Sequence, residues 1–249
     1  MIKTFLSDRS KEIIFGSILG DGSLKLHKPY KNARFSFKHS VKQRDYFLWK
    51  AKELEEISSE KNIWEQKNDG FGLDKIRFQS RALEELTDLY KLTHRKNKLV
   101  IKRKWLNKMS PLSLAVWWMD DGSIIANGRK GVICTDSFDL ESQKLLANYL
   151  KKVWKVQVSI NPITRNYKSD VKKYYRLWIS SSEELKKFLR IILPHIKIES
   201  MLYKAIIFYK DSQLQQRWIS EVVNLTGFKP EVVEKVLNDR KLKRKDFRK

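Results

Sequence analysis

The stretch LAVWWMDDG, residues 114–122, decides the fold of this chain. It is typical of an apolar helix that ends in two aspartates and a glycine. An aspartate at the edge of a buried surface is unfavourable unless it has a partner or a function. A second copy of the pattern, IFGSILGDG, occupies residues 14–22. The sequence therefore predicts two apolar helices that each deliver an aspartate, Asp21 and Asp121, at their C-terminal ends.

The composition indicates a globular protein that binds a polyanion. The chain has 249 residues, of which 41% are hydrophobic, so it can form one large domain or two modest ones. It carries 52 lysines and arginines against 29 acidic residues, a net charge of +23. Nucleic acid and an anionic membrane surface both fit such a charge. No run approaches the roughly 18 apolar residues of a membrane span, so nucleic acid is favoured and no membrane partner is expected.

Cysteine and histidine usage restricts the metal chemistry. Cys134 is the only cysteine, which excludes an internal disulfide framework and a cysteine-based zinc site. The four histidines show no ligand spacing, so oxygen ligands are expected to hold any bound metal. The first residues resemble neither a signal peptide nor a transit peptide. We expect an intracellular protein, cytoplasmic (nucleoid) or organellar, and not secreted.

Both halves of the chain show the same order of predicted elements, α-β-β-α-β-β-α. We therefore expect an α+β fold with two pseudo-symmetric half-domains, at residues 1–106 and 107–210. Trp117 and Trp118 lie inside the second motif helix and are expected in the core. A helical, basic extension follows at residues 211–249. It is either an appendage with a solvated tail or an additional DNA contact.

The two motif aspartates indicate a metal centre. If the motif helices pack side by side through Gly16 and Gly20, Asp21 and Asp121 face each other. Two carboxylates so close raise each other's pKa unless a cation lies between them. A carboxylate is also disfavoured at the C-terminal end of a helix dipole, although a solvated helix terminus remains the alternative. Mg²⁺ or another hard divalent cation suits aspartate and carbonyl oxygens, which indicates metal-assisted phosphodiester hydrolysis.

The two motifs resemble those of the LAGLIDADG homing endonuclease family in its single-chain form with two motifs. The second motif begins with Leu-Ala and ends with Asp-Asp-Gly, whereas the first keeps Gly16, Asp21 and Gly22 but has Ile14-Phe15 at its start. The resemblance covers roughly residues 8 to 210. It implies a site-specific endonuclease that cuts both strands of a long DNA target across the minor groove, leaves 3′ overhangs and spreads an intron or intein.

The resemblance also implies roles for particular residues. Asp21 and Asp121 correspond to the family's metal ligands, and the residue before each, Gly20 or Asp120, offers a backbone carbonyl. Asp120 can also be a polar residue that merely ends the helix. Family members place a lysine late in each repeat to act on solvent or developing charge. Lys98 and Lys204 fit that position, although chance matches are easy among 52 basic residues.

Two antiparallel four-stranded sheets would form a saddle in the DNA major groove, whose base edges carry a full hydrogen-bonding code. Alternation along the strands selects candidate contacts, of which some touch only phosphate or are solvated surface. In the first half they are Lys25, Lys28, Lys31, Arg34, Ser36, Lys38, Arg77 and Gln79. In the second half they are Asn127, Arg129, Lys130, Arg165, Lys168, Lys172 and Arg176.

Two other functions remain open. An RNA maturase would bind its own group I intron RNA with the same basic surface and assist splicing. A non-cleaving DNA-binding regulator could use the same scaffold, but loss of a motif aspartate would favour that function, and both aspartates are present. We expect a monomer, because one chain holds both motifs.

Overall fold

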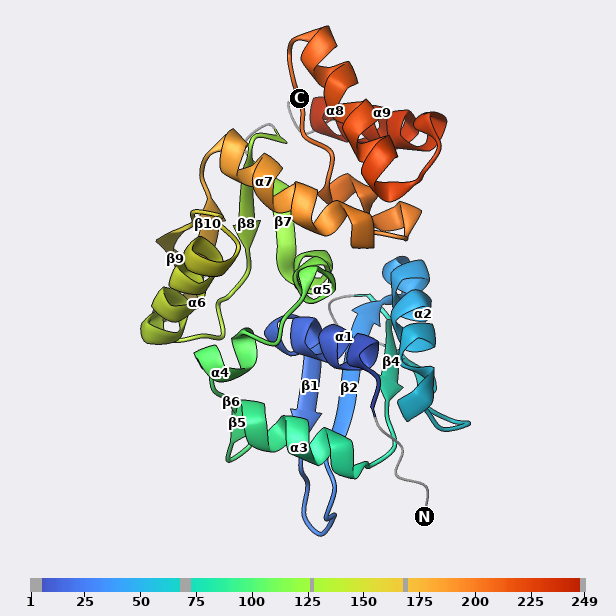
Figure 1. The fold of residues 1–249 in the computed structure, drawn as a ribbon, viewed down its shortest axis with the longest axis vertical. Coiled ribbons are helices and arrows are strands. Elements are labelled where there is room, and N and C mark those ends of the chain that lie inside the picture. Colours follow the sequence, from blue (N-terminus) through green and yellow to red (C-terminus); the bar gives the residue numbers. More distant parts are fainter. Residues whose placement is uncertain (1–5, 68–72, 126–127, 168–169, 247–249) are drawn as a thin grey trace. The chain divides into compact units, whose positions relative to one another are not determined.

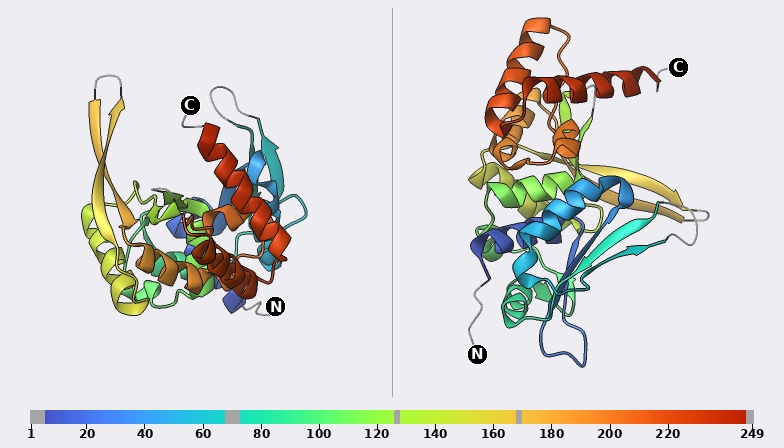
Figure 2. Two further views of the ribbon diagram at one scale, coloured as in Figure 1. Left: turned by 90° about the horizontal axis from the view of Figure 1, so that it is seen from above. Right: turned by 90° about the vertical axis from the view of Figure 1, so that its right-hand side faces the viewer.

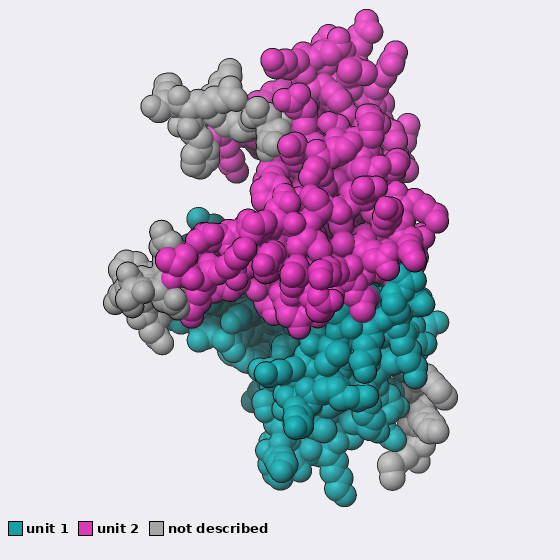
Figure 3. Space-filling model, turned by 90° about the vertical axis from the view of Figure 1, so that its left-hand side faces the viewer, with its two compact units in different colours: residues 1–120 teal, residues 121–249 magenta. Residues whose placement is uncertain are grey.

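The computed structural model describes residues 6–67, 73–125, 128–167 and 170–246. The chain divides into two compact units, residues 1–120 and 121–249 (Figure 3). Within the described residues, no helix combines the length and the apolar character that crossing a membrane requires. The domain boundaries expected from the repeat, 1–106, 107–210 and 211–249, stay a prediction.

The first unit contains a four-stranded antiparallel sheet with strand order β1-β2-β4-β3 (Figure 1). The described elements are, in order, α1 (Asp8–Leu19), β1 (Gly22–Lys25), β2 (Arg34–Ser40), η1 (Val41–Gln43), α2 (Arg44–Glu53), η2 (Glu55–Ile57), β3 (Ile63–Gln66), β4 (Lys75–Gln79), α3 (Glu84–Thr93), β5 (His94–Arg95), β6 (Lys98–Leu99), α4 (Arg103–Leu106) and α5 (Pro111–Asp121). Helix α5 belongs to this unit up to Asp120.

The second unit repeats the same sheet, with order β7-β8-β10-β9, and adds two helices after it. Its described elements are β7 (Gly122–Ile125), β8 (Lys130–Ile133), α6 (Leu140–Val153), β9 (Ser159–Tyr167), β10 (Asp170–Ile179), α7 (Ser182–Ile192), η4 (Leu193–His195), η5 (Glu199–Lys204), α8 (Ser212–Thr226) and α9 (Pro230–Asp246). Figure 2 shows β9 and β10 extending as a two-stranded ribbon beyond the shorter strands of their sheet. The predicted α+β fold with two αββαββα repeats and a helical extension is confirmed.

Side-chain caps set the starts of several helices. The Ser7 hydroxyl accepts a hydrogen bond from the Ser10 N–H at the start of α1, and Asp139 accepts one from the Ser142 N–H at the start of α6. Such caps satisfy amide groups that have no partner inside the helix. Helix α8 ends at Gly227, which adopts the left-handed conformation with φ 78°.

The two motif helices, α1 and residues 111–120 of α5, pack in direct contact within the first unit. A Cβ atom at Gly16 would lie 2.3 Å from the Ser113 carbonyl oxygen and 2.9 Å from the Val116 Cβ. The Ser113 hydroxyl donates a hydrogen bond to the Glu12 carbonyl at 2.8 Å. Trp117 and Trp118 are fully buried, which confirms that they belong to the core. The absence of a side chain at position 16 therefore sets the spacing of these helices.

Replacing Gly16 tests this spacing. Gly16→Ala should lower the free energy of unfolding by about 1–3 kcal/mol, because the added methyl group forces the helices apart. Urea unfolding followed by circular dichroism measures the change. Gly227→Asn is the control, since a Cβ atom added there would have no atom of another residue beyond its chain neighbours within 4 Å, and asparagine tolerates a positive φ. Equal stability of Gly16→Ala and the wild type would show that the helices are not held at this distance.

Candidate active site and nucleic-acid interface

Asp21 lies between α1 and β1, and its side chain is 42% exposed. Its backbone N–H donates a hydrogen bond to the Oδ2 atom of Asp120 at 3.2 Å. The Asp21 carboxylate is thus exposed to solvent, while the Asp120 carboxylate holds the Asp21 main chain. This is an arrangement in which a side chain can reach an ion or a substrate.

Asp120 is the last residue but one of helix α5, and its carboxylate is fully buried. The Oδ1 atom accepts hydrogen bonds from the Tyr46 hydroxyl at 2.7 Å and from the Lys50 Nζ at 2.6 Å. The residue as a whole is only partly buried, so its exposed surface belongs to the main chain. The buried side chain is engaged by a lysine, which leaves the backbone carbonyl as the part of Asp120 that suits a metal.

His39 stands beside both aspartates. Its Nδ1 lies 3.3 Å from the Asp21 Oδ2, and its Nε2 lies 3.8 Å from the Asp120 Oδ1. Both ring nitrogens are buried, and neither has a hydrogen-bond partner among the described residues. One ligand atom from each of Asp21, His39 and Asp120 lies within 4.8 Å of the others, but the Asp120 carboxylate is already paired with Lys50, so Asp21 and His39 are the side chains that could bind an ion here. Sequence spacing did not reveal His39, because it approaches Asp21 through strand pairing.

In the second unit, Asp121 and Lys204 come together around Cys134. The Asp121 carbonyl accepts a hydrogen bond from the Cys134 N–H at 3.0 Å. Burial raises the pKa of the Cys134 thiol, and the charges of Arg176, Asp121, Asp136 and Lys204 also act on it. Lys204, at the end of η5, is only 6% exposed. The structure therefore brings this predicted lysine into the surroundings of the predicted aspartate.

Lys98 is placed differently, as an exposed residue of the short strand β6. Its neighbour Asn97 exchanges two hydrogen bonds of 3.3 Å with the backbone of Leu26, just past the end of β1. The segment is thus attached to the strand that follows Asp21. The catalytic role of Lys98 stays a prediction.

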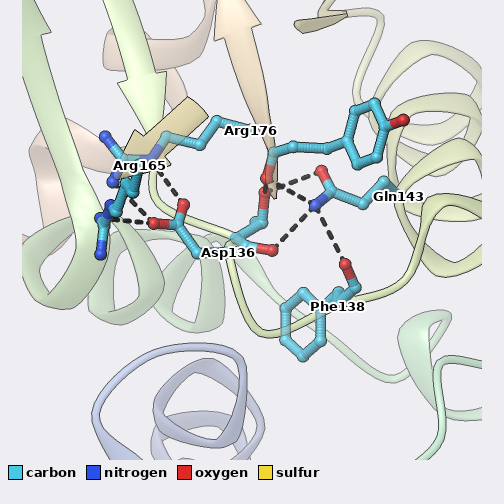
Figure 4. Close-up of polar contacts among 7 residues, drawn as sticks. Asp136, Phe138, Gln143, Arg165 and Arg176 are labelled. Carbon is cyan, nitrogen blue, oxygen red and sulfur yellow. Dashed lines mark hydrogen bonds and ion pairs between the residues drawn. The ribbon is translucent and has the colours of Figure 1, made fainter. Parts of the chain in front are cut away.

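A cluster of polar contacts fixes two of the predicted arginines (Figure 4). Asp136 accepts two hydrogen bonds from Arg176, at 2.5 and 2.7 Å, and one from Arg165 at 2.6 Å. Gln143 holds the adjoining backbone by donating to the Thr135 and Tyr175 carbonyls at 2.8 and 2.7 Å. The hydrogen bond from Arg176 is the main reason that the pKa of Asp136 lies below its usual value. The two guanidinium groups are thereby held in defined positions.

Strand register places predicted contacts on one face of each sheet, because directly paired residues share a face. In the first sheet Arg34 pairs with Lys25, Ser36 with Gln79, and Lys38 with Arg77, while the alternate residues Phe35 and Phe37 are buried. In the second sheet Lys172 pairs with Arg165, and Arg176 lies on the same face. The alternation of apolar and polar residues in the sequence therefore selected residues that share one face of a sheet. Their contacts with DNA stay a prediction.

The remaining predicted contacts lie at the edges of the sheets. Lys28 and Lys31 are exposed between β1 and β2, and Arg129 and Lys130 are exposed at the start of β8. Asn127 and Lys168 lie outside the described residues. Sequence reasoning missed Trp64, which is 42% exposed and pairs with Arg77. A tryptophan next to the polar Glu65 and Gln66 was the available signal in the sequence.

Comparison with known proteins identifies the family. A model of the LAGLIDADG DNA endonuclease family matches residues 11–188. The chain therefore belongs to this family, as the two motifs indicated. A structure of the homing endonuclease I-WcaI bound to its DNA recognition sequence is similar, with a TM-score of 0.69 and 25% sequence identity. The match covers 83% of this chain and 89% of that one.

Two curated relatives represent different functions. Protein RecA of Mycobacterium gastri is 27% identical over 236 residues, which cover 88% of this chain and 52% of that protein. The chain thus spans about half the length of this relative. The cytochrome b mRNA maturase bI2 of Debaryomyces hansenii is 26% identical over 198 residues, which cover 78% of this chain and 72% of the maturase.

The Asp136 cluster predicts a pH dependence of stability. Because the folded-state pKa of Asp136 is lowered, its ion pairs contribute fully above the unfolded pKa near 4. That contribution is lost as the pH falls through the lowered folded pKa. Asp136→Asn should therefore be less stable than the wild type at pH 7, with the difference shrinking toward pH 3.

Urea unfolding midpoints across this pH range measure the difference. Lys144→Met, which removes an exposed partner of Glu141 on α6, should change the midpoint little at any pH. A difference between Asp136→Asn and the wild type that stays constant from pH 7 to acid would contradict the assignment.

Proposed function

We propose that this chain is a site-specific homing endonuclease that makes double-strand breaks in a long DNA target by divalent-metal-assisted phosphodiester hydrolysis. The observation that carries the proposal is the exposed carboxylate of Asp21 at the end of a motif helix, 3.3 Å from a buried His39 nitrogen that makes no hydrogen bond among the described residues. Membership of the family supports it, as does the similarity to a homing endonuclease bound to DNA. One motif aspartate in each half gives one strand-cutting centre for each strand.

The donor set near Asp21 fits a divalent cation, and we assign Mg²⁺ to it. Asp21 and Asp121 would hold the metal with their carboxylates, and Gly20 and Asp120 with their backbone carbonyls. When bound, such a metal lowers the pKa of water and stabilises the leaving oxygen of the cleaved phosphodiester. Lys204, buried near Asp121, and Lys98 would assist. Their positive charges would stabilise the negative charge that develops on the cleaved phosphodiester.

The protein would bind its target as a monomer. The polar faces of its two sheets would form the DNA-binding surface. Each sheet presents lysines and arginines on the side away from its buried residues, and hairpins of this kind suit the major groove. Arg165 and Arg176, held by Asp136, present their guanidinium groups with little freedom left to lose. Bidentate contacts from arginine to guanine are the usual means of reading a base in this groove.

RNA binding is the second candidate function. The observation that favours it is the similarity to the cytochrome b mRNA maturase bI2, which extends over 72% of that protein. The same basic surface would bind the chain's own intron RNA, and retained aspartates do not exclude this use. A maturase would act inside the compartment that holds its transcript, which agrees with an intracellular, organellar or cytoplasmic location. A non-cleaving regulator is the third alternative.

Substitution of the motif aspartates tests the proposal. The protein is incubated with Mg²⁺ and a pool of randomised duplexes, and double-strand breaks are detected by sequencing the new ends. Asp21→Asn and Asp121→Asn should each slow cleavage of the selected target by roughly 100-fold or more, because a metal ligand is lost. DNA affinity should change by less than about twofold, because neither aspartate is among the proposed groove contacts. Chelation of the metal should abolish cleavage.

Asp139→Asn provides the matched control, since it makes the same charge change at the exposed start of α6. It should cut DNA at the wild-type rate. A loss of DNA affinity in Asp21→Asn as large as the loss of cleavage would show that Asp21 is structural. Absence of breaks together with tight binding of intron RNA would support the maturase.

A further inference from the structure

We infer that Lys50 and Tyr46 position Asp21 by holding the Asp120 carboxylate against its main chain, and that only one of the two motif aspartates is held in this way. The inference rests on the proposed function, because it concerns the same metal site. Lys50 and Tyr46 are positioning residues here, since neither is placed to touch the substrate. We call Lys50, Tyr46 and Asp120 the buried clamp.

The two oxygens of the Asp120 carboxylate have separate partners. Oδ1 accepts from the Tyr46 hydroxyl and the Lys50 Nζ, both of which come from α2. Oδ2 accepts from the backbone N–H of Asp21, which follows α1. A single carboxylate therefore links three helices of the first unit at the residue that presents the exposed carboxylate. Movement of α2 or α5 would displace Asp21 directly.

The charged groups of the clamp are buried. The side chains of Lys50 and Asp120 are both 0% exposed. The Lys50 Nζ also lies 5.0 Å above the centroid of the Phe37 ring and 4.7 Å above that of Tyr46. A buried ion pair adds little stability over a well-packed apolar pair, because desolvation offsets the attraction. What this pair adds beyond apolar packing is a fixed geometry around Asp21.

Gly20 is the residue that lets the clamp reach Asp21. A Cβ at Gly20 would lie 2.5 Å from the Asp120 Cβ and 2.9 Å from its Oδ2. Any larger side chain would push the carboxylate away from the N–H that it binds. The absence of a side chain at position 20 and the aspartate at position 120 are therefore complementary.

The two repeats differ at the positions that form the clamp. Phe37 and Ile133 are equivalent, because they pair with the motif glycines Gly22 and Gly122. Counting the same number of residues onward from each makes Leu146 the equivalent of Lys50. Gly20 is likewise the equivalent of Asp120 in the first motif. Neither Gly20 nor Leu146 carries a charge, so the positions equivalent to Asp120 and Lys50 do not form an ion pair with each other.

The test replaces both residues of the ion pair with uncharged residues, as found at the equivalent positions of the other repeat. Lys50→Leu combined with Asp120→Ala removes the acceptor for the Asp21 N–H and leaves no buried charge without a partner. Cleavage of each strand is followed separately with end-labelled target DNA and Mg²⁺. The strand that Asp21→Asn slows more is the strand assigned to Asp21. In the double variant this strand should be cut about tenfold to 100-fold more slowly, relative to the other strand.

Further readouts separate positioning from loss of stability. The Mg²⁺ concentration for half-maximal cleavage of the affected strand should rise, while DNA affinity changes by less than about twofold. Ser80→Ala is the control, because it removes another buried side-chain contact in the same unit, to the Phe35 N–H. It should lower thermal stability without changing the ratio of the two strands. Tyr46→Phe removes the hydroxyl that donates to the Asp120 Oδ1 and to the Val116 carbonyl but keeps the ion pair. It should shift the ratio in the same direction, and it serves if the double variant does not fold.

Hydrogen exchange of the Asp21 amide tests the clamp without cleavage. NMR should show at least about tenfold faster exchange of this amide in the double variant, and wild-type exchange in Ser80→Ala. Equal slowing of both strands, or an unchanged strand ratio with unchanged exchange, would overturn the inference. Failure of the wild-type protein to cut any duplex would refute the proposed function, and the exchange measurement would still decide whether the clamp holds Asp21.

Discussion

The close contact between α1 and residues 111–120 of α5 is the constraint on which the first unit depends. With no side chain at Gly16 and Gly20, the two helices approach until Ser113 and Asp120 occupy the space where Cβ atoms would stand. This approach carries Asp120 over the end of α1, where it meets the Asp21 N–H. The helices therefore do more than fill the core with Trp117 and Trp118. They also determine the position of the Asp21 main chain, and therefore the point from which its exposed carboxylate projects.

Local signals were enough to predict the elements and their order. Alternating apolar residues placed Phe35 and Phe37 on the buried face, and helix caps such as Asp139 marked the starts of helices. These signals extend over only a few residues, so they can be recognised in a single sequence without knowledge of the tertiary structure. The repeat then supplied the long-range information, because the second sheet has the same strand order as the first. Family membership follows from the same repeated motif.

The surroundings of the site could not be predicted, because they depend on contacts between distant residues. Lys50 and Asp120 are separated by seventy positions, and His39 meets Asp21 only when β2 pairs with β1. One signal was available, since Lys50 lies four residues after the buried Tyr46 of α2 and four before the buried Leu54 that follows this helix. A lysine on an apolar face indicates a buried anion nearby. Periodicity alone could not say that this anion is Asp120.

The two adjacent aspartates of the second motif, Asp120 and Asp121, have different surroundings. Consecutive residues of a helix project about 100° apart, so Asp120 and Asp121 cannot face the same surroundings. Asp120 is buried and paired with Lys50, so its charge is already balanced and does not compete for a cation. A second carboxylate without such a cation beside it would instead repel the carboxylate of Asp21. With Asp120 paired to Lys50 inside the protein, one carboxylate holds the main chain while that of Asp21 stays exposed to solvent.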